Sequence, residues 1–182
     1  IYSTPTLSFI GSLDWIPNIE GLEWFLKDIW PQLIRKYPEL TFHVAGRNMP
    51  DSLIERKEPN VFFYGEVPDA KAFINNHPIT IVPLLSGSGM RVKILEGMFL
   101  GRIVITTSLG LEGINAQHKN QVLVADTVEE FVKAVEFCFE HPIQTQNISH
   151  RAQVFAAKNY DNLEIGKELL SFYRMKKELI TT

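Results

Sequence analysis

The fold is decided by residues 79–106, which read ITIVPLLSGSGMRVKILEGMFLGRIVIT. Short runs rich in β-branched and apolar residues open and close this stretch, at Ile79 to Leu84 and at Ile103 to Thr106, and they predict strands buried on both faces. A helix is expected between them, from Arg91 to Leu100, and Gly101 stands where a left-handed residue would end it. A strand, a helix and a second strand in this order predict a parallel pair with a right-handed crossover.

The same alternation continues on both sides of this stretch. Further strands of the same type are predicted at Leu7 to Ile10, Leu40 to Ala45, Val61 to Tyr64 and Val122 to Ala125. Further helices are predicted at Ile19 to Tyr37, with a kink or break at Pro31, at Asp69 to Asn76 and at Thr127 to His141. The pattern predicts the doubly wound α/β class, a Rossmann-like parallel sheet of about six strands with helices on both faces and C-terminal helices.

The last part of the chain departs from this alternation. From Ser149 onward no strand is predicted, and apolar residues such as Ile165 and Leu169 indicate one or two helices. We therefore divide the chain into a Rossmann-like domain, residues 1–148, and a C-terminal helical extension, residues 149–182. The extension is expected to pack on that domain or on a domain outside this chain, which we expect to be part of a longer protein.

Composition excludes several classes of protein. The 182 residues are 45% hydrophobic and 21% charged with a formal net charge of -3, which is typical of a globular, soluble domain and not of a disordered chain. No apolar run approaches the roughly 20 residues that cross a bilayer. No broad basic face is available for nucleic acid, so a nucleic-acid partner is not expected.

Cysteine use and the first residues favour a cytoplasmic protein. Cys138 is the single cysteine and is expected in the core, and no signal-peptide pattern is present. Basic residues near the end of the chain allow peripheral contact with the inner face of a membrane, although a solvated helix end is the simpler interpretation. They are Arg174, Lys176 and Lys177.

The loop after the strand at Ile79 to Leu84 is the strongest candidate for a ligand site, because ligands in such sheets bind beyond the carboxyl ends of the strands. Gly87 and Gly89 let the backbone approach a ligand, and the first amides of the next helix point outward at the positive end of its dipole. Arg91 and Lys93 place cations where the dipole favours anions, a conflict that a bound diphosphate would resolve. These features predict a phosphate-binding loop.

The helix after this loop has a second interpretation. We expect it to bury one apolar stripe, made of Val92, Leu95 and Phe99. Lys93 and Glu96 would then lie three residues apart on the surface, so the alternative is a flexible turn followed by a solvated ion pair. Trp15, in the loop after the first strand, is a weaker candidate for lining a site.

Known phosphate, hydrolase and metal motifs are not matched. The P-loop pattern is absent, and Val92 stands where the dinucleotide fingerprint needs its third glycine. Ser88 does not lie in a G-x-S-x-G elbow. No Asp-x-Asp occurs, and metal-ligand spacing is lacking among the histidines, which are His43, His77, His118, His141 and His150. We predict a site without a metal or another cofactor.

Several short segments follow one another in a recognisable order. They are Phe9 to Ser12 with Pro17-Asn18, Val44 to Arg47, Val61 to Val67, Pro83-Leu84 with Gly87 to Gly89, Arg91, Lys93 to Gly97, Gly101, Thr106-Thr107 and Gly110 to Ile114. In order and spacing they resemble the carboxyl-terminal half of retaining glycosyltransferases with the GT-B fold, of the family 4 kind, also called group 1. The resemblance covers the chain from about Leu7 to Pro142.

The resemblance implies that residues 1–148 bind a UDP- or GDP-sugar donor, while an amino-terminal domain outside this chain binds most of the acceptor. It implies a hexosyltransferase of polysaccharide or glycoconjugate biosynthesis that is inactive without that domain. Glu96 would accept hydrogen bonds from the ribose hydroxyls, and the backbone of Val67 would meet the base. Amides that would face the donor sugar and the β-phosphate are those of Gly87, Ser88, Gly89 and Met90.

Two departures from the family concern charge. The usual motif has two glutamates separated by seven residues, and counting back from Glu96 places Ser88 at the first. Many members also carry Arg and, six residues on, Lys after the first strand, where this chain has Ser12 and Asn18. Cations from elsewhere would then have to stabilise the charge that builds on the leaving diphosphate. The candidates are Arg47, Arg91 and Lys93, of which the last two would act as leaving-group stabilisers.

Two other functions stay open at this point. An NAD(P)-dependent oxidoreductase domain fits the sheet type, and the missing third glycine argues against it. A noncatalytic interaction domain of the response-regulator shape also fits, although only Asp14 stands where such domains carry an acidic cluster. The residues leave open the base, the sugar, the acceptor and the oligomeric state, and retention is implied by the resemblance alone.

Overall fold

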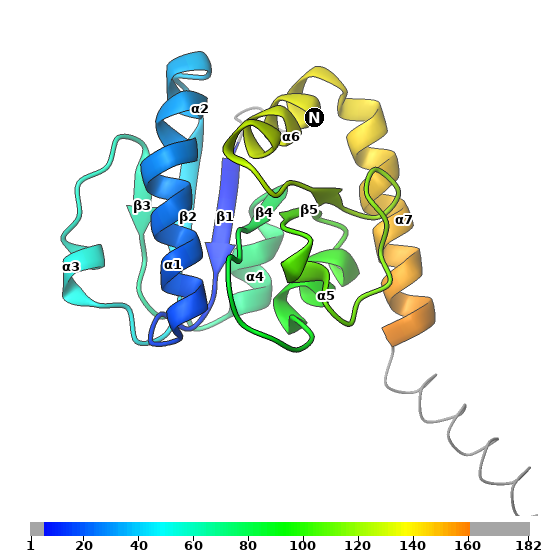
Figure 1. Ribbon diagram of the computed structural model, residues 1–182, viewed down its shortest axis with the longest axis horizontal. Coiled ribbons are helices and arrows are strands. Elements are labelled where there is room, and N and C mark those ends of the chain that lie inside the picture. The colour runs from blue at the N-terminus through cyan, green and yellow to red at the C-terminus, as the bar shows by residue number, and fades with distance from the viewer. Residues whose placement is uncertain (1–5, 161–182) are drawn as a thin grey trace, which may run out of the picture.

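Six parallel strands form the sheet of the computed structural model, which describes residues 6–160. Their order across the sheet is β3-β2-β1-β4-β5-β6 (Figure 1). Each pair of neighbours is parallel, as the alternation of strands and helices predicts. The bounds are β1 Thr6–Ile10, β2 Thr41–Ala45, β3 Val61–Phe63, β4 Ile79–Val82, β5 Ile103–Thr106 and β6 Leu123–Val124. The predicted doubly wound class is confirmed.

The helices between the strands lie where apolar spacing predicts them. Their bounds are α1 Ile16–Trp24, α2 Trp30–Lys36, α4 Ala70–Asn75, α5 Val92–Phe99 and α6 Val128–Glu140. Two short elements were not predicted, the four-residue α3 Asp51–Ile54 and a 3-10 turn Leu109–Leu111. Both are too short to show a helical repeat in the sequence.

The first helix accommodates Pro31 through a wider turn and not through a break. A π-helical turn, Phe25–Ile29, joins α1 to α2, and the amide of Trp30 donates to the carbonyl of Phe25, five residues earlier. Proline has no amide hydrogen, and its ring clashes with the carbonyl four residues before it. A wider turn immediately ahead of Pro31 accommodates both effects, so the helix continues without a break. The kink, the other predicted outcome, stays a prediction.

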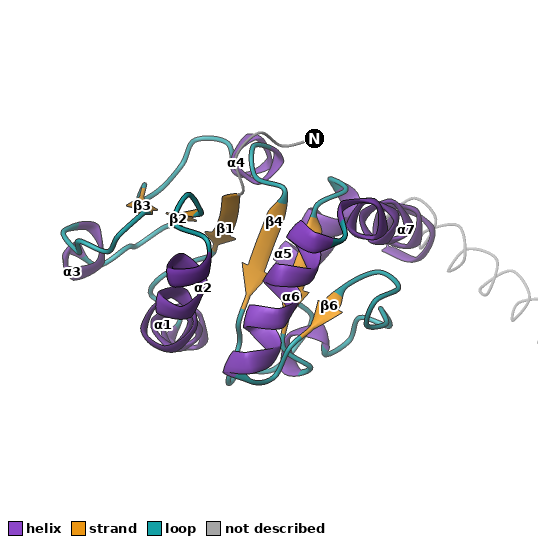
Figure 2. Ribbon diagram, turned by 90° about the horizontal axis from the view of Figure 1, so that it is seen from above, coloured by secondary structure: helices purple, strands orange, loops and turns teal. Residues whose placement is uncertain are grey.

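The two faces of the sheet carry separate cores. On one face α1, α2 and α6 cover buried residues of the strands, among them Leu7, Phe9, Phe42, Ile81 and Ile105. On the other face α5 and α7 pack over a second cluster that includes Val82, Ile94, Met98, Val104 and Ala152. Figure 2 shows α1 and α2 on one side of the sheet and α4 on the other. Burial of Cys138 in the first core confirms the expected structural place of this residue.

Two expectations about burial are wrong. Phe62 is 48% exposed because β3 is an edge strand whose outer positions are not covered. Val92 is 64% exposed, and α5 buries a different stripe, made of Ile94, Gly97 and Met98. A Cβ on Gly97 would lie 3.0 Å from Cγ2 of Val104, so α5 lies closest to the sheet at the residue that has no side chain. Glycine has no apolar side chain, so the sequence pattern does not show a buried stripe that is centred on Gly97.

The C-terminal part of the described chain is one long helix, α7, Pro142–Tyr160. It buries Ile148, Ala152 and Ala156 and packs against α5 and β5. The predicted boundary at residue 148 falls inside this helix, and the division into two units stays a prediction. Residues 161–182 lie outside the described residues, and so does the basic stretch at Arg174 to Lys177. None of the helices within residues 6–160 is long and apolar enough to cross a membrane.

Candidate functional site

The loop after β4 lies where the two halves of the sheet diverge. β1 and β4 are neighbours, but the chain leaves β1 for α1 on one face and leaves β4 for α5 on the other. In open α/β sheets the carboxyl ends of such strands border the ligand site. In Figure 1 the β1 arrow points to this edge of the sheet. The loop of residues 86–90, called the 86–90 loop below, therefore stands at the expected position.

The 86–90 loop depends on two glycines with positive φ. Gly87 has a φ of +92°, and an added Cβ would lie 3.0 Å from the Trp15 ring. Gly89 has a φ of +89°, and nothing lies within 4 Å of its Cβ position. Backbone angles of this kind favour glycine. The loop is thus closely packed at Gly87 and open at Gly89.

Carboxylates hold this loop at both ends. The hydroxyl of Ser86 donates to Oε2 of Glu20 on α1 at 2.6 Å. The amide of Gly89 donates to Oε2 of Glu112, which follows the 3-10 turn after β5, at 2.8 Å. The loop after β4 is therefore connected to the segments that follow both neighbouring strands.

Arg91 is a buried cation with unpaired donors. The residue is 6% exposed, its Nη1 donates to the carbonyl of Ser88, and its guanidinium lies 5.0 Å from the centre of the Trp15 ring. Its Nε and Nη2 are buried and have no hydrogen-bond partner among the described residues. Leaving buried donors of a charged group unpaired costs free energy. Such an arrangement is suited to an anionic ligand that would accept these hydrogen bonds.

Lys93 reaches from α5 to the loop after β1. Its Nζ donates to Oδ1 of Asn18 at 2.5 Å and lies 4.7 Å from the centre of the Phe9 ring. Asn18 in turn donates through Nδ2 to the carbonyl of Ser12 at 2.8 Å. Burial, with a smaller contribution from the charge of Arg91, lowers the pKa of Lys93 to about 7. The alternative interpretation, a surface ion pair of Lys93 with Glu96, is wrong, because the ammonium points to Asn18.

The contact of Lys93 with Asn18 brings a positive charge to the loop after β1, which has no cation at positions 12 and 18. Ser12 and Asn18 occupy the positions at which the resemblance leads us to expect cations, and the Lys93 ammonium lies against Asn18. A Cβ on Gly11 would lie 3.0 Å from the same ammonium, so the first loop passes directly beside it. A cation that comes from α5 is therefore presented at the end of β1.

The remaining predicted residues lie on the same edge without joining this cluster. Arg47 is exposed after β2, and its carbonyl accepts from the amide of Leu13 at 2.8 Å. Val67, after β3, and Glu96, on α5, are partly exposed, and Met90 is exposed. Within residues 6–160, no hydrogen bond or ring contact joins these side chains to Arg91 or Lys93. Their roles toward a nucleotide stay predictions.

Neither a role for Glu112 nor the contact of Asn18 with Lys93 is predicted from the sequence. Glu112 lies in the segment Gly110 to Ile114, and its position after β5, next to the switch point, was the available signal. The partner of Lys93 had no local signal, because Asn18 is 75 residues away.

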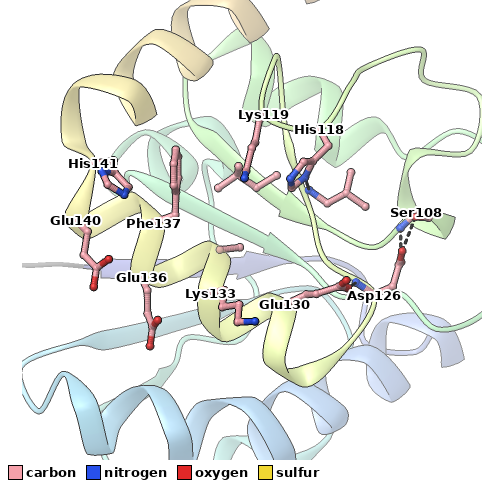
Figure 3. A pocket seen from close by; sticks show the side chains of 13 residues that line it. Ser108, His118, Lys119, Asp126, Glu130, Lys133, Glu136, Phe137, Glu140 and His141 are labelled. Carbon is pink, nitrogen blue, oxygen red and sulfur yellow. Dashed lines mark hydrogen bonds between the residues drawn. The ribbon is translucent and has the colours of Figure 1, made fainter.

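A separate pocket of about 750 Å³ lies between β6 and α6 (Figure 3). None of the predicted site residues lines it. Two of its acids already have partners, since Asp126 accepts from the amide of Ser108 at 2.6 Å and Glu130 accepts from the amide of Asp126 at 2.7 Å. These two carboxylates therefore serve the local fold. Within residues 6–160 no cluster of three or more His, Cys, Asp or Glu could hold a metal.

Comparison with known proteins assigns the chain to a family. The model of the glycosyl transferases group 1 matches residues 4–141. A relative from Klebsiella pneumoniae, "Uncharacterized 44.6 kDa protein in cps region", is 26% identical over 167 residues, which are 86% of this chain and 43% of that protein. The chain thus spans less than half the length of this curated relative.

Solved structures support the same fold. The C-terminal domain of the group 1 glycosyl transferase LpcC from Francisella tularensis matches with a TM-score of 0.71 and 15% identity over 87% of both chains. Anabaena Alr3699/HepE in complex with UDP-glucose matches with a TM-score of 0.75 and 17% identity over 95% of this chain and 49% of that one. Sucrose-phosphate synthase from Thermosynechococcus elongatus matches with a TM-score of 0.76 and 14% identity over 97% and 46%. With the Rossmann-like sheet and the family match, the chain belongs to the group 1 glycosyl transferases and has the fold of a GT-B carboxyl-terminal domain.

Proposed function

We propose that this chain is the donor-binding half of a glycosyltransferase that moves a hexose from a nucleoside diphosphate to an acceptor. The observation that carries the proposal is a pair of cations, the buried Arg91 with unpaired Nε and Nη2 and the partly buried Lys93 at the end of β1. Most of the acceptor would be bound by a domain outside this chain. The relative from a cps region supports a role in polysaccharide or glycoconjugate synthesis.

The chemistry explains why the cations are needed. Breaking the bond between the sugar and the diphosphate builds negative charge on the leaving group, and fixed cations aimed at that charge lower the barrier. Arg91 would donate two hydrogen bonds through nitrogens that lack partners among the described residues. Lys93 would take up a proton as the diphosphate binds, because its pKa of about 7 would rise beside an anion.

The donor is proposed to be a UDP- or GDP-sugar. Solved structures of Alr3699/HepE with UDP-glucose and with UDP support a uridine nucleotide as the first probe. Val67 would meet the base through its backbone, Glu96 would accept from the ribose hydroxyls, and Arg47 would add charge near the diphosphate. Direct neutralisation by side chains makes this a site without a metal or another cofactor. We place the protein in the cytoplasm, where the basic residues near the end of the chain would allow peripheral contact with the inner face of a membrane.

A calorimetric titration with UDP, GDP and NAD tests the proposal. We expect UDP or GDP to bind, with no saturable binding of NAD, and Lys93→Met to weaken nucleotide binding by about tenfold to a hundredfold, as expected for a lost charged hydrogen bond. Lys71→Met is the matched control, because Lys71 is exposed on α4. Equal nucleotide affinity of Lys93→Met and the unchanged chain would remove Lys93 from the site. Binding of NAD alone would favour the oxidoreductase.

A further inference from the structure

The carboxylate of Glu112 is fixed at Gly89, near the end of the 86–90 loop. Its Oε2 accepts from the Gly89 amide at 2.8 Å. Two further contacts join the same segments: Oγ1 of Thr107 donates to the carbonyl of Leu84 at 2.7 Å, and the Cβ position of Gly113 lies 3.5 Å from Cβ of Met90. Contacts on both sides of Glu112 therefore hold it in place.

This contact makes the Gly89 amide a poor site for a phosphate. The Gly89 amide has one hydrogen, and it is directed at a carboxylate. A phosphate on the same amide would lie beside the negative charge of Glu112, which is unfavourable at such short range. The diphosphate is therefore better placed with Arg91 and Lys93 than at Gly89.

The strand order separates the two charges in space. Besides the hydrogen bond of Arg91 to the Ser88 carbonyl within the loop itself, Arg91 and Lys93 contact Trp15, Phe9 and Asn18, all in or after β1. Glu112 comes from the segment after β5, and β4 lies between β1 and β5. The cations thus lie on the β1 side of the 86–90 loop, and the carboxylate lies on the β5 side.

A nucleoside diphosphate sugar has the same linear order as these groups. The base stands at one end, the diphosphate in the middle and the sugar at the other end. In the proposed function the base lies at Val67, after β3, and the diphosphate lies at the cations between β1 and β4, so the sugar end falls toward β5. The span from β3 to β5 is four strand spacings, roughly 19 Å.

We infer that Glu112 recognises the donor sugar, by accepting hydrogen bonds from its hydroxyl groups through Oε1 while Oε2 remains on Gly89. An ionised carboxylate is an acceptor with about four lone-pair sites and so can serve the amide and a sugar hydroxyl at once. The inference rests on the proposed function and adds the part of the site that selects a hydroxyl-bearing sugar.

Paired titrations with UDP and with UDP-glucose, and with GDP and GDP-mannose, test the role of Glu112. For the pair that the unchanged chain binds, Glu112→Ala is expected to weaken the nucleotide sugar by about tenfold or more and to leave the nucleotide within about twofold. Glu20→Ala is the matched control, because Glu20 holds the same loop through Ser86 but lies on the β1 side. It is expected to affect the nucleotide and the nucleotide sugar equally.

Three outcomes would overturn the inference and leave the proposed function in place. Equal losses of both ligands in Glu112→Ala would mean that the carboxylate only positions the loop. Tighter nucleotide binding would mean that the carboxylate competes with a phosphate for the Gly89 amide. A sugar that adds nothing to the affinity of the unchanged chain would mean that no hydroxyl is recognised. Failure of every nucleotide to bind the unchanged chain would overturn the proposed function itself, and the inference with it.

Discussion

Helices α5 and α6 begin in opposite ways. α6 starts with a capping box, in which Thr127 accepts from the Glu130 amide and the Glu130 carboxylate accepts from the Thr127 amide. The N-cap of α5 is Arg91, whose side chain makes no capping hydrogen bond, and the first turn of the helix carries Lys93 and no acid. One helix start is completed by its own acids, whereas the other places cations against its dipole. The difference teaches how the candidate site is distinguished from the pocket beside α6. The candidate site has buried donors of Arg91 without partners, and the presence of a pocket is not what marks it.

The largest expected effect is the pH dependence that Lys93 gives to folding. Because its pKa falls from 10.5 to about 7 on folding, the unfolded chain binds more protons between these values and stability rises with pH across this window. We expect the unfolding free energy of the unchanged chain, relative to Lys93→Met, to rise by about 3 kcal/mol from pH 7 to pH 10. Urea denaturation at both pH values measures it.

A matched control isolates the effect of Lys93 from the other groups that titrate in this range. Lys71→Met removes an exposed lysine and is expected to keep the pH dependence of the unchanged chain. If Lys93→Met keeps it as well, the ammonium is solvated and the contrast between the two helix starts loses one of its two cations.

The next largest effect is expected on nucleotide binding, when the N-cap of α5 is replaced by a residue that can cap the helix as Thr127 caps α6. Arg91→Ser places a capping hydroxyl at the position that now carries the unpaired guanidinium. Loss of charge-assisted hydrogen bonds is expected to weaken UDP or GDP by about a hundredfold, measured by calorimetry. Arg35→Ser, on α2, is the control for loss of a positive charge elsewhere. Equal affinity of Arg91→Ser and the unchanged chain would mean that Arg91 only supports the loop.

The fold could be predicted from sequence because its signals are local. Runs such as Ile79 to Val82 and Ile103 to Thr106, separated by a helical pattern, leave few topologies other than a parallel sheet. The exposed side of Phe62 could not be predicted, because an edge strand and a central strand read alike until the strand order is known. The buried stripe of α5 was hidden by Gly97, whose role in packing lies in having no side chain.

The candidate site was predictable in part for the same reason. The glycines and cations of the 86–90 loop and α5 adjoin one another in sequence, and topology places them at the switch point. The contacts of Lys93 with Asn18 and of Glu112 with Gly89 join segments 75 and 23 residues apart. Such contacts depend on how loops of neighbouring strands meet, which no periodicity encodes.

The smallest expected effect concerns the completed helix start. Thr127→Ala removes the hydroxyl that accepts from the Glu130 amide and is expected to lower the unfolding free energy by about 1 kcal/mol. Urea denaturation measures the loss, and Ser52→Ala, at an exposed position of α3, is the control. Nucleotide affinity should not change, because the groups at the start of α6 bind one another. A Thr127→Ala variant with unchanged stability but weaker nucleotide binding would reverse the assignment and move the site to the pocket beside α6.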